Sequence, residues 1–184
     1  KFDEPLGLST GAADIFGTTG GVMEAAIRTV YEVVTGRELP FEQLHVKPLA
    51  GLDRIKTAEL VIDNPKKEYD FLNGFKVNVA VTSGLKGASI LLDEIVSGKS
   101  AYHFIEVMGC PGGCISGGGQ PRPVNNEIRK KRMDAIYKED EGKQLRKSHE
   151  NPDITKIYKE FLGKPLGHKS HELLHTHYVK RNKY

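Results

Sequence analysis

A strand–helix–strand pattern in residues 75–108 constrains the fold of this chain more than any other feature. Bulky apolar side chains stand at every second position of residues 75–81, which predicts a strand. Residues 88–96 then carry apolar side chains at helical spacing, and residues 102–108 form a second strand-like run. A strand, a helix of crossover length and another strand are typical of a βαβ unit, whose two strands are parallel. We therefore predict an α/β fold with a small parallel sheet flanked by helices.

Two segments before this unit add a helix and a strand. Apolar residues recur at helical spacing after Gly20-Gly21, and Gly36 and Pro40 provide stop signals, so we predict a helix here. The glycine-rich stretch GAADIFGTTGG precedes it. Such a loop can hold an anion at a helix N-terminus, or it can simply form a tight turn. Residues 56–62 predict a further strand.

The composition changes after Pro123, and this change suggests a boundary. Residues 125–150 are strongly charged and carry few apolar side chains, as expected of a solvated helix that wraps another part of the molecule. A further helix is expected after Asn151. We therefore predict one lobe at residues 1–121 and a C-terminal helical or irregular wrapping segment at residues 122–184.

The composition argues against several classes of protein. With 184 residues, 38% of them hydrophobic, the chain can bury a core of its own. Its 27 basic and 24 acidic residues are interspersed, so we expect no nucleic-acid partner. No apolar run is long enough to span a bilayer, and the first residues lack the apolar stretch of a secretory signal. We expect a cytoplasmic protein; a periplasmic one stays open, because the chain begins at Lys1 without an initiator Met and a longer protein is expected upstream.

Both cysteines of the chain lie in one glycine-rich loop, EVMGCPGGCISGGGQP, at residues 106–121. Cys110 and Cys114 follow the second strand of the predicted βαβ unit, and ligands of open parallel sheets bind outside the carboxyl ends of the strands. Soft thiolates select zinc, copper or iron–sulfur clusters, and the glycines let the backbone wrap closely around such a group. Two thiolates cannot complete a four-cysteine site, so further ligands would come from elsewhere. A disulfide is the alternative, but one that closes so small a loop would remove little entropy from the unfolded chain. We rank it below metal ligation because of the glycines on either side.

A second metal-binding pattern lies near the C-terminus. His171, Glu172 and His175 match the HExxH pattern of zinc peptidases, in which two histidines bind the metal and the glutamate activates water. The pattern has only three fixed positions, and neither His168 nor His177 supplies a third ligand at a recognised spacing. Two interpretations are open, a zinc hydrolase or histidines that hydrogen-bond within a C-terminal cap, and we favour the cap.

Three segments of the chain resemble one known family. FIEVMGCPGGCISGGGQPRP resembles the third cysteine motif in the catalytic domain of iron-only, or di-iron, hydrogenases. GAADIFGTTGGVMEAAIRT and SHELLHTHY resemble other segments of that domain, and all three follow the family's order from near Gly11 to Tyr178. The resemblance implies the second lobe of a two-lobed catalytic domain, fused to a segment that is a separate small subunit in some relatives. It also implies that the SHELLHTHY ending is structural, so that HELLH is accidental.

The resemblance further implies a cofactor and four site residues. The cofactor is a 4Fe-4S cluster bridged to a di-iron subsite, together called the H-cluster, and the reaction is the reversible oxidation of dihydrogen to two protons and two electrons. Cys110 would be a terminal ligand of the 4Fe-4S cluster, and Cys114 would be the thiolate that bridges it to the di-iron subsite. Met108 would lie beside that subsite, and Phe16 would lie in its apolar surroundings.

The family's first two cysteine motifs occur nowhere in this sequence. We therefore expect the remaining ligands on a missing N-terminal lobe or subunit, and we expect this chain alone to be inactive. The other expected partners are an electron carrier, either ferredoxin or a nicotinamide-linked subunit, with dihydrogen and protons as substrates. The alternative within the same family is a noncatalytic iron–sulfur assembly protein, which would keep the 4Fe-4S ligands and lack the di-iron subsite.

Overall fold

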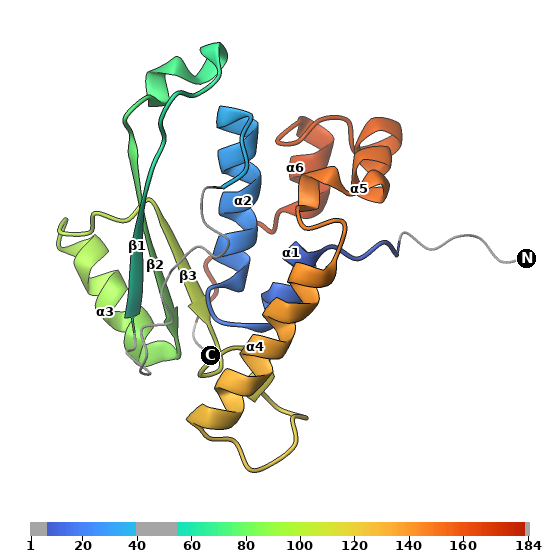
Figure 1. Cartoon of the computed structure of the whole chain (residues 1–184). Coiled ribbons are helices and arrows are strands. Elements are labelled where there is room, and N and C mark those ends of the chain that lie inside the picture. Colours follow the sequence, from blue (N-terminus) through green and yellow to red (C-terminus); the bar gives the residue numbers. More distant parts are fainter. Residues whose placement is uncertain (1–6, 40–54, 183–184) are drawn as a thin grey trace, which may run out of the picture.

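The structure is a computed structural model that describes residues 7–39 and 55–182. It contains three strands and six α-helices within those residues, joined by shorter helical turns (Figure 1). The elements are α1 (Gly11–Asp14), α2 (Gly21–Thr35), β1 (Ile55–Val61), β2 (Lys76–Ser83), α3 (Leu85–Val96), β3 (Phe104–Met108), α4 (Asn126–Gly142), α5 (Pro152–Ile157) and α6 (His168–Leu174). The helical turns are Ile15–Gly17, Lys67–Leu72, Cys114–Ser116, Ser148–Glu150 and Tyr158–Leu162.

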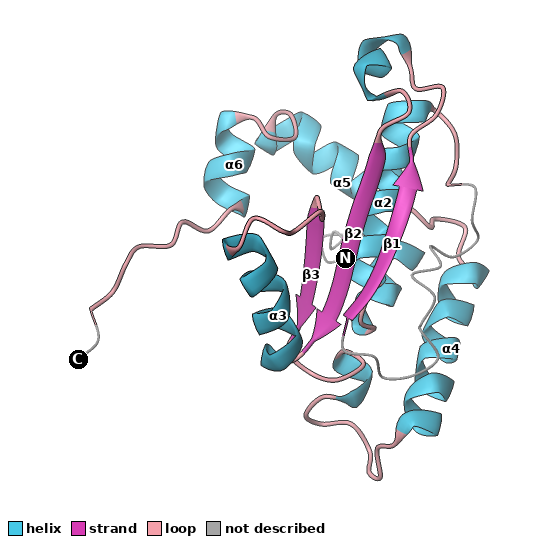
Figure 2. Ribbon diagram, turned by 90° about the vertical axis from the view of Figure 1, so that its left-hand side faces the viewer, coloured by secondary structure: helices cyan, strands magenta, loops and turns pink. Residues whose placement is uncertain are grey.

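The three strands form one mixed sheet in the order β1-β2-β3. Strands β2 and β3 are parallel, with Val81 opposite Glu106, so the predicted α/β class and the parallel βαβ unit are confirmed. Strand β1 runs antiparallel to β2, as Figure 2 shows, so the sheet is mixed where the sequence predicted a parallel one. The reason is the connection between them, which turns back on itself: Ile62 N donates to Phe75 O at 2.9 Å and Gly74 N donates to Ile62 O at 2.7 Å. Such a direct return pairs neighbouring strands antiparallel.

Helix α2 covers one face of the sheet and α3 covers the other (Figure 1 and Figure 2). The spacing of its buried side chains gives α2 one apolar face toward the sheet. The main core comprises Met23, Ile27, Tyr31, Val34, Leu60, Ile62, Val79 and Val81. Helix α2 ends at Gly36, whose φ of 71° is the left-handed conformation that favours glycine, and Pro40 lies outside the described residues. Within residues 7–39 and 55–182, no helix combines the length and the apolar character needed to cross a bilayer.

The stretch before α2 is helical, although the sequence predicted a glycine-rich loop there. Thr10 begins α1, and its side-chain oxygen accepts a hydrogen bond from Ala13 N at 3.3 Å. Ala12 and Ile15 are fully buried in a small second core beside α4. A Cβ at Gly11 would lie 1.9 Å from Asp140 Oδ1, so this glycine lets α1 and α4 approach each other. The glycine there serves close packing between helices, which explains why the loop prediction was wrong.

Candidate metal centre

The cysteine loop joins β3 to α4 and lies at the carboxyl ends of the two parallel strands (Figure 1). Gly84 N, in the turn after β2, donates a hydrogen bond to Met108 O at 2.7 Å. The turn after β2 and the loop after β3 therefore meet at one edge of the sheet, as the sequence predicted. Open parallel sheets bind ligands at this edge.

The cysteine loop has a defined backbone conformation. Gly113 N donates to Cys110 O at 3.0 Å, and a single 3₁₀ turn covers Cys114–Ser116. Both cysteines are free thiols, and both are exposed. A Cβ at Gly117 would lie 3.5 Å from Cys110 Sγ and 3.5 Å from Cys114 O, so both cysteines border the same glycine. The loop therefore presents two accessible sulfur donors within one short stretch of backbone.

The glycine-rich stretch before α2 packs directly against the cysteine loop. Thr19 N donates to Gly112 O at 3.1 Å. A Cβ at Gly113 would lie 2.7 Å from Gly17 O and 2.8 Å from Thr19 N, so a side chain at this position would clash with backbone. Three segments from distant parts of the sequence are thus brought to one edge of the sheet.

Replacing Gly113 by alanine is expected to lower the free energy of unfolding by at least about 2 kcal/mol, because φ is 94° there and the new methyl group would meet backbone atoms. Gly118→Ala is the matched control, since a Cβ there would meet nothing within 4 Å. The control should change stability by less than about 1 kcal/mol in urea unfolding. Equal stability of the two variants would show that the two loops do not dock as described.

Glu106 connects the strand before the cysteine loop to the start of α2. Its carboxylate is buried, with Oε1 accepting from Gly20 N at 2.6 Å and Oε2 accepting from Met23 N at 2.7 Å. An anion at a helix N-terminus is favourable, because the backbone N–H groups there have no helical partner. The protein's own carboxylate thus fills the anion site that the glycine-rich stretch suggested. The sequence analysis did not identify this role of Glu106. The feature that could have indicated it is a single charged residue in an otherwise apolar strand.

Besides the glycine-rich stretch before α2, two arginines of α4 contact the cysteine loop. Arg132 donates from Nη1 to Ile115 O and from Nη2 to Pro121 O, each at 2.7 Å. Arg129 donates from Nε to Ser116 Oγ at 3.0 Å. The charged wrapping segment predicted from the sequence therefore touches the part of the cysteine loop that follows Cys114.

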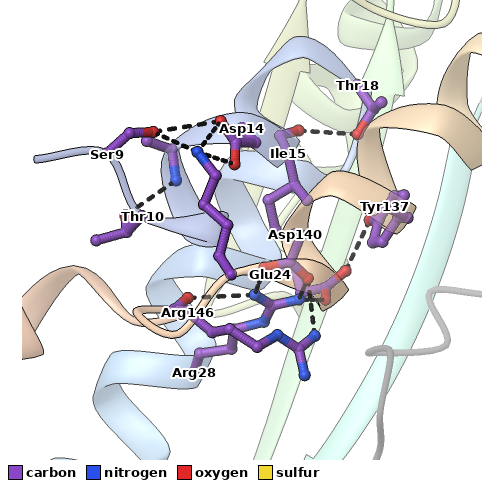
Figure 3. Close-up of polar contacts among 12 residues, drawn as sticks. Ser9, Thr10, Asp14, Ile15, Thr18, Glu24, Arg28, Tyr137, Asp140 and Arg146 are labelled. Carbon is purple, nitrogen blue, oxygen red and sulfur yellow. Dashed lines mark hydrogen bonds and ion pairs between the residues drawn. The ribbon is translucent and has the colours of Figure 1, made fainter.

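A buried ionic cluster fixes α4 to α2 (Figure 3). Asp140 is fully buried and accepts hydrogen bonds from both terminal nitrogens of Arg28, at 2.7 and 2.8 Å, and from Arg146 at 2.7 Å. Arg28 also donates to Glu24 at 2.6 Å, and Tyr137 donates its hydroxyl to the same carboxylate at 2.7 Å. Each charge of this cluster is paired, as buried charges must be.

The protonation of the cluster follows from burial and from these partners. Burial raises the pKa of Glu24 against the effect of Arg28. Burial and the neighbouring Glu24 raise the pKa of the Tyr137 hydroxyl, which stays protonated and donates. Burial disfavours the Asp140 carboxylate, but hydrogen bonds from Arg28 and Arg146 outweigh burial and lower its pKa. The cluster is therefore an anchor between helices, built around an ionised Asp140.

Met108 and Phe16 complete the set of site residues predicted from the sequence. Met108 ends β3 and is half-buried beside the cysteine loop. Phe16 lies in the turn before α2, next to the Gly17 carbonyl that borders the loop, and it is 46% exposed. The structure thus brings both residues to the edge that carries Cys110 and Cys114. Their contacts with a cofactor stay a prediction, and the exposure of Phe16 means that this chain alone does not enclose it.

The HExxH pattern starts inside α6, and its residues are exposed. His171 Nδ1 and His175 Nδ1 lie 2.6 Å apart, an arrangement in which one imidazole donates to the other. Among the residues that the structure describes, the three side chains placed closely enough to share a metal ion are Glu32, His149 and Glu150. In that group the Lys147 ammonium already bridges the two glutamates, at 2.5 and 2.9 Å. The described part of the chain gives the HExxH pair no third ligand.

The donors at the cysteine loop fit a group that takes sulfur ligands. Two free thiols lie on a glycine-rich backbone at the ligand-binding edge of a sheet. Two sulfur donors satisfy half of the ligand requirement of a 4Fe-4S cluster or a tetrahedral zinc ion. The donor set alone does not distinguish these two groups.

Comparison with known proteins distinguishes the 4Fe-4S cluster from the zinc ion. Two family models match the chain: "Iron only hydrogenase large subunit, C-terminal domain" over residues 1–118, and "Iron hydrogenase small subunit" over residues 126–181. The first match contains the cysteine pair, and the second contains the arginines of α4.

Three similar proteins match between 85% and 99% of the chain. The NADP-reducing hydrogenase subunit HndD of Solidesulfovibrio fructosivorans is 50% identical over 99% of this chain and 29% of its own length. A solved structure of a variant of FeFe-hydrogenase HydA1 from Chlamydomonas reinhardtii matches with a TM-score of 0.74 and 42% identity, over 97% of this chain and 49% of that one. A probable cytosolic Fe-S cluster assembly factor of Drosophila persimilis is 30% identical over 85% of this chain and 30% of its own length. The chain thus spans less than half the length of each of these relatives.

Proposed function

Because this chain belongs to the family of the C-terminal domain of iron-only hydrogenase large subunits, we propose that it forms one half of a hydrogenase active site. The complete protein would catalyse the reversible oxidation of dihydrogen to two protons and two electrons. The observation that carries this proposal is the pair of free, exposed thiols in one loop at the carboxyl edge of the sheet, inside the segment that matches the family. The position of that pair is where ligands of such sheets bind.

In this proposal the two cysteines hold a 4Fe-4S cluster bridged to a di-iron subsite, and that group supplies the chemistry of dihydrogen cleavage when bound. Cys110 is a terminal ligand of the 4Fe-4S cluster, and Cys114 is the bridging thiolate. Met108 and Phe16 place apolar side chains at the site, which would exclude water and lower the local dielectric. The position of Met108 and Phe16 at the edge that carries both thiols supports these two roles.

The other ligands must come from polypeptide outside these 184 residues, because Cys110 and Cys114 are the only cysteines here. We assign them to an N-terminal lobe or subunit, consistent with the share of the relatives' length that this chain leaves uncovered. The bounds of the two family matches support a division into a lobe at residues 1–121 and a small-subunit-like segment at residues 122–184. The name of the NADP-reducing relative supports a nicotinamide-linked electron carrier over ferredoxin.

A hydrogen-evolution assay tests the proposed function. The complete protein, matured without oxygen and supplied with a reduced viologen dye, is expected to evolve hydrogen, whereas the chain of 184 residues alone should evolve none. The reason is that half of the cluster ligands are missing from the chain. Hydrogen evolution by the chain alone would overturn the assignment of missing ligands.

The assembly-factor alternative is weaker but has one observation in its favour, the 30% identity to the Drosophila protein. The 50% identity to a hydrogenase subunit outweighs it. The same assay separates the two functions, since an assembly factor would bind iron and sulfide in the complete protein yet evolve no hydrogen.

A further inference from the structure

We propose that Arg129 and Arg132 of α4 are positioning residues of the active site, which hold the cysteine loop in its ligating conformation and set the reduction potential of the cluster. This inference rests on the proposed function and deepens it. It gives the small-subunit-like segment a role at the metal site in addition to packing.

The first support is the geometry of Arg132. Its guanidinium bonds the carbonyl of Ile115, directly after Cys114, and the carbonyl of Pro121, where the loop leaves the site. A rigid planar fork that reaches two carbonyls fixes the distance between them, which a flexible single-point cation does not do. Arg132 therefore ties the two ends of the segment 115–121 to one point on α4.

Arg129 adds a second contact one turn earlier on the same face of α4. It donates to Ser116 Oγ, and its Cδ would lie 3.3 Å from a Cβ at Gly112. Residues three apart share a helix face, so both guanidiniums reach the same loop. Together they hydrogen-bond the residues that follow Cys114, and the Arg129 stem lies beside Gly112, which precedes it.

The two elements that hold the cysteine loop, α4 and β3, are themselves fixed to α2. The buried pair between Asp140 and Arg28 holds α4 against α2. The N-terminus of α2 is in turn held by Glu106, four residues before Cys110. The cysteine loop is thus held at its start by β3 and at its end by α4, and both elements are tied to α2.

Arg129 and Arg132 also bring positive charge to the cysteine loop. The two guanidinium groups contact Ser116 and Ile115, which follow the proposed ligand Cys114 by two and one residues. Reduction adds negative charge to an iron–sulfur cluster, so nearby cations favour the reduced form and raise the reduction potential. Removing one of them should shift the midpoint potential to more negative values.

Matched controls stand on the same helix. Lys130 and Lys131 lie between the two arginines in sequence, but they pair with Asp134 and Glu127 and are exposed. Their substitution removes the same formal charge from α4 without touching the loop.

The experiment compares Arg132→Gln, Arg132→Lys and Arg129→Gln with Lys130→Gln and Lys131→Gln in the full-length holoprotein. Hydrogen exchange should become about tenfold faster at the loop amides of Gly113, Ser116 and Gly117 in Arg132→Gln, because charged hydrogen bonds that hold the loop are lost. Its 4Fe-4S midpoint potential, followed by electron paramagnetic resonance, should shift to more negative values. Arg129→Gln should show smaller changes in the same directions. Arg132→Lys keeps the charge but bonds one carbonyl, so its potential should stay near wild type while loop exchange still rises.

The two lysine variants should match wild type in both measurements. Loop exchange and midpoint potential in Arg132→Gln equal to those of Lys130→Gln would overturn the inference. If Arg132→Gln also loses hydrogen-exchange protection in α2, the variant has unfolded. The comparison of loop exchange between Arg132→Lys and wild type then tests the inference in its place. A wild-type protein that binds no iron would instead refute the proposed function. Loop exchange in that protein and its variants would still decide whether Arg129 and Arg132 hold the cysteine loop.

Discussion

Replacing Asp140 by asparagine is expected to lower the free energy of unfolding by about 3–5 kcal/mol, because it removes one partner of a buried ion pair and leaves the other charged. Arg28 would stay buried with Glu24 as its remaining anionic partner. Asparagine has nearly the same shape as aspartate, so the close approach to Gly11 is preserved and the effect reports charge rather than packing. Urea unfolding followed by circular dichroism measures the change.

Asp134→Asn is the matched control on the same helix. Asp134 pairs with Lys130 at 2.6 Å, but both side chains are largely exposed, so this pair contributes at most about 1 kcal/mol. A loss in Asp140→Asn no larger than in Asp134→Asn would contradict a buried anchor between α2 and α4.

The contribution of Asp140 should also depend on pH. Its pKa is lower in the folded protein than in the unfolded chain. Such a carboxyl group stabilises the folded state above the pKa of the unfolded chain, about 3.9, and this stabilisation is lost as the pH falls through the lower folded value. The difference in stability between wild type and Asp140→Asn should therefore be constant above about pH 5 and shrink at more acidic pH. A difference that grows on acidification would contradict the assignment of an ionised Asp140.

Replacing Cys114 by serine is expected to abolish hydrogen evolution in the complete protein and to remove the di-iron subsite altogether. The reason is that Cys114 is proposed to be the sole bridge between that subsite and the 4Fe-4S cluster, and a serine hydroxyl is a hard ligand that binds iron–sulfur clusters poorly. Cys110→Ser should instead weaken the 4Fe-4S cluster itself and lower its iron content. Iron analysis and electron paramagnetic resonance measure both losses.

Gly118→Ala in the same loop is the control for the cysteine variants, since the added methyl group would meet no atom within 4 Å. It should keep wild-type iron content and activity. Full iron content in both cysteine variants would show that the cluster, if present, is held elsewhere.

Local patterns predicted the regular elements of the central fold well. The strand, helix and strand of the βαβ unit appear as β2, α3 and β3, with ends shifted by a few residues from those predicted. The alternation of apolar side chains depends only on neighbours in sequence, and so it is visible without a structure. The antiparallel direction of β1 was missed because direction is set by the path of the connection, which carries no periodic signal.

The cysteine loop could be found from sequence because cysteines and clustered glycines are rare residue types with specific chemistry. The residues that hold the loop could not be found in this way. Arg132 and Asp140 belong to a helix with charged side chains on nearly all sides, which predicts a solvated face, yet Asp140 is fully buried. Its contacts with Arg28, Arg146 and Gly11, which only the folded chain shows, distinguish it from exposed neighbours such as Asp134.

Infrared spectroscopy of the complete protein tests the central claim most directly. The di-iron subsite that the family resemblance implies carries carbonyl and cyanide on iron, and these groups absorb where protein does not. The wild-type protein is expected to show these bands, and Cys114→Ser is expected to lack them while Gly118→Ala keeps them. Absence of the bands from an iron-loaded wild-type protein, or their persistence in Cys114→Ser, would contradict a di-iron subsite held by this loop.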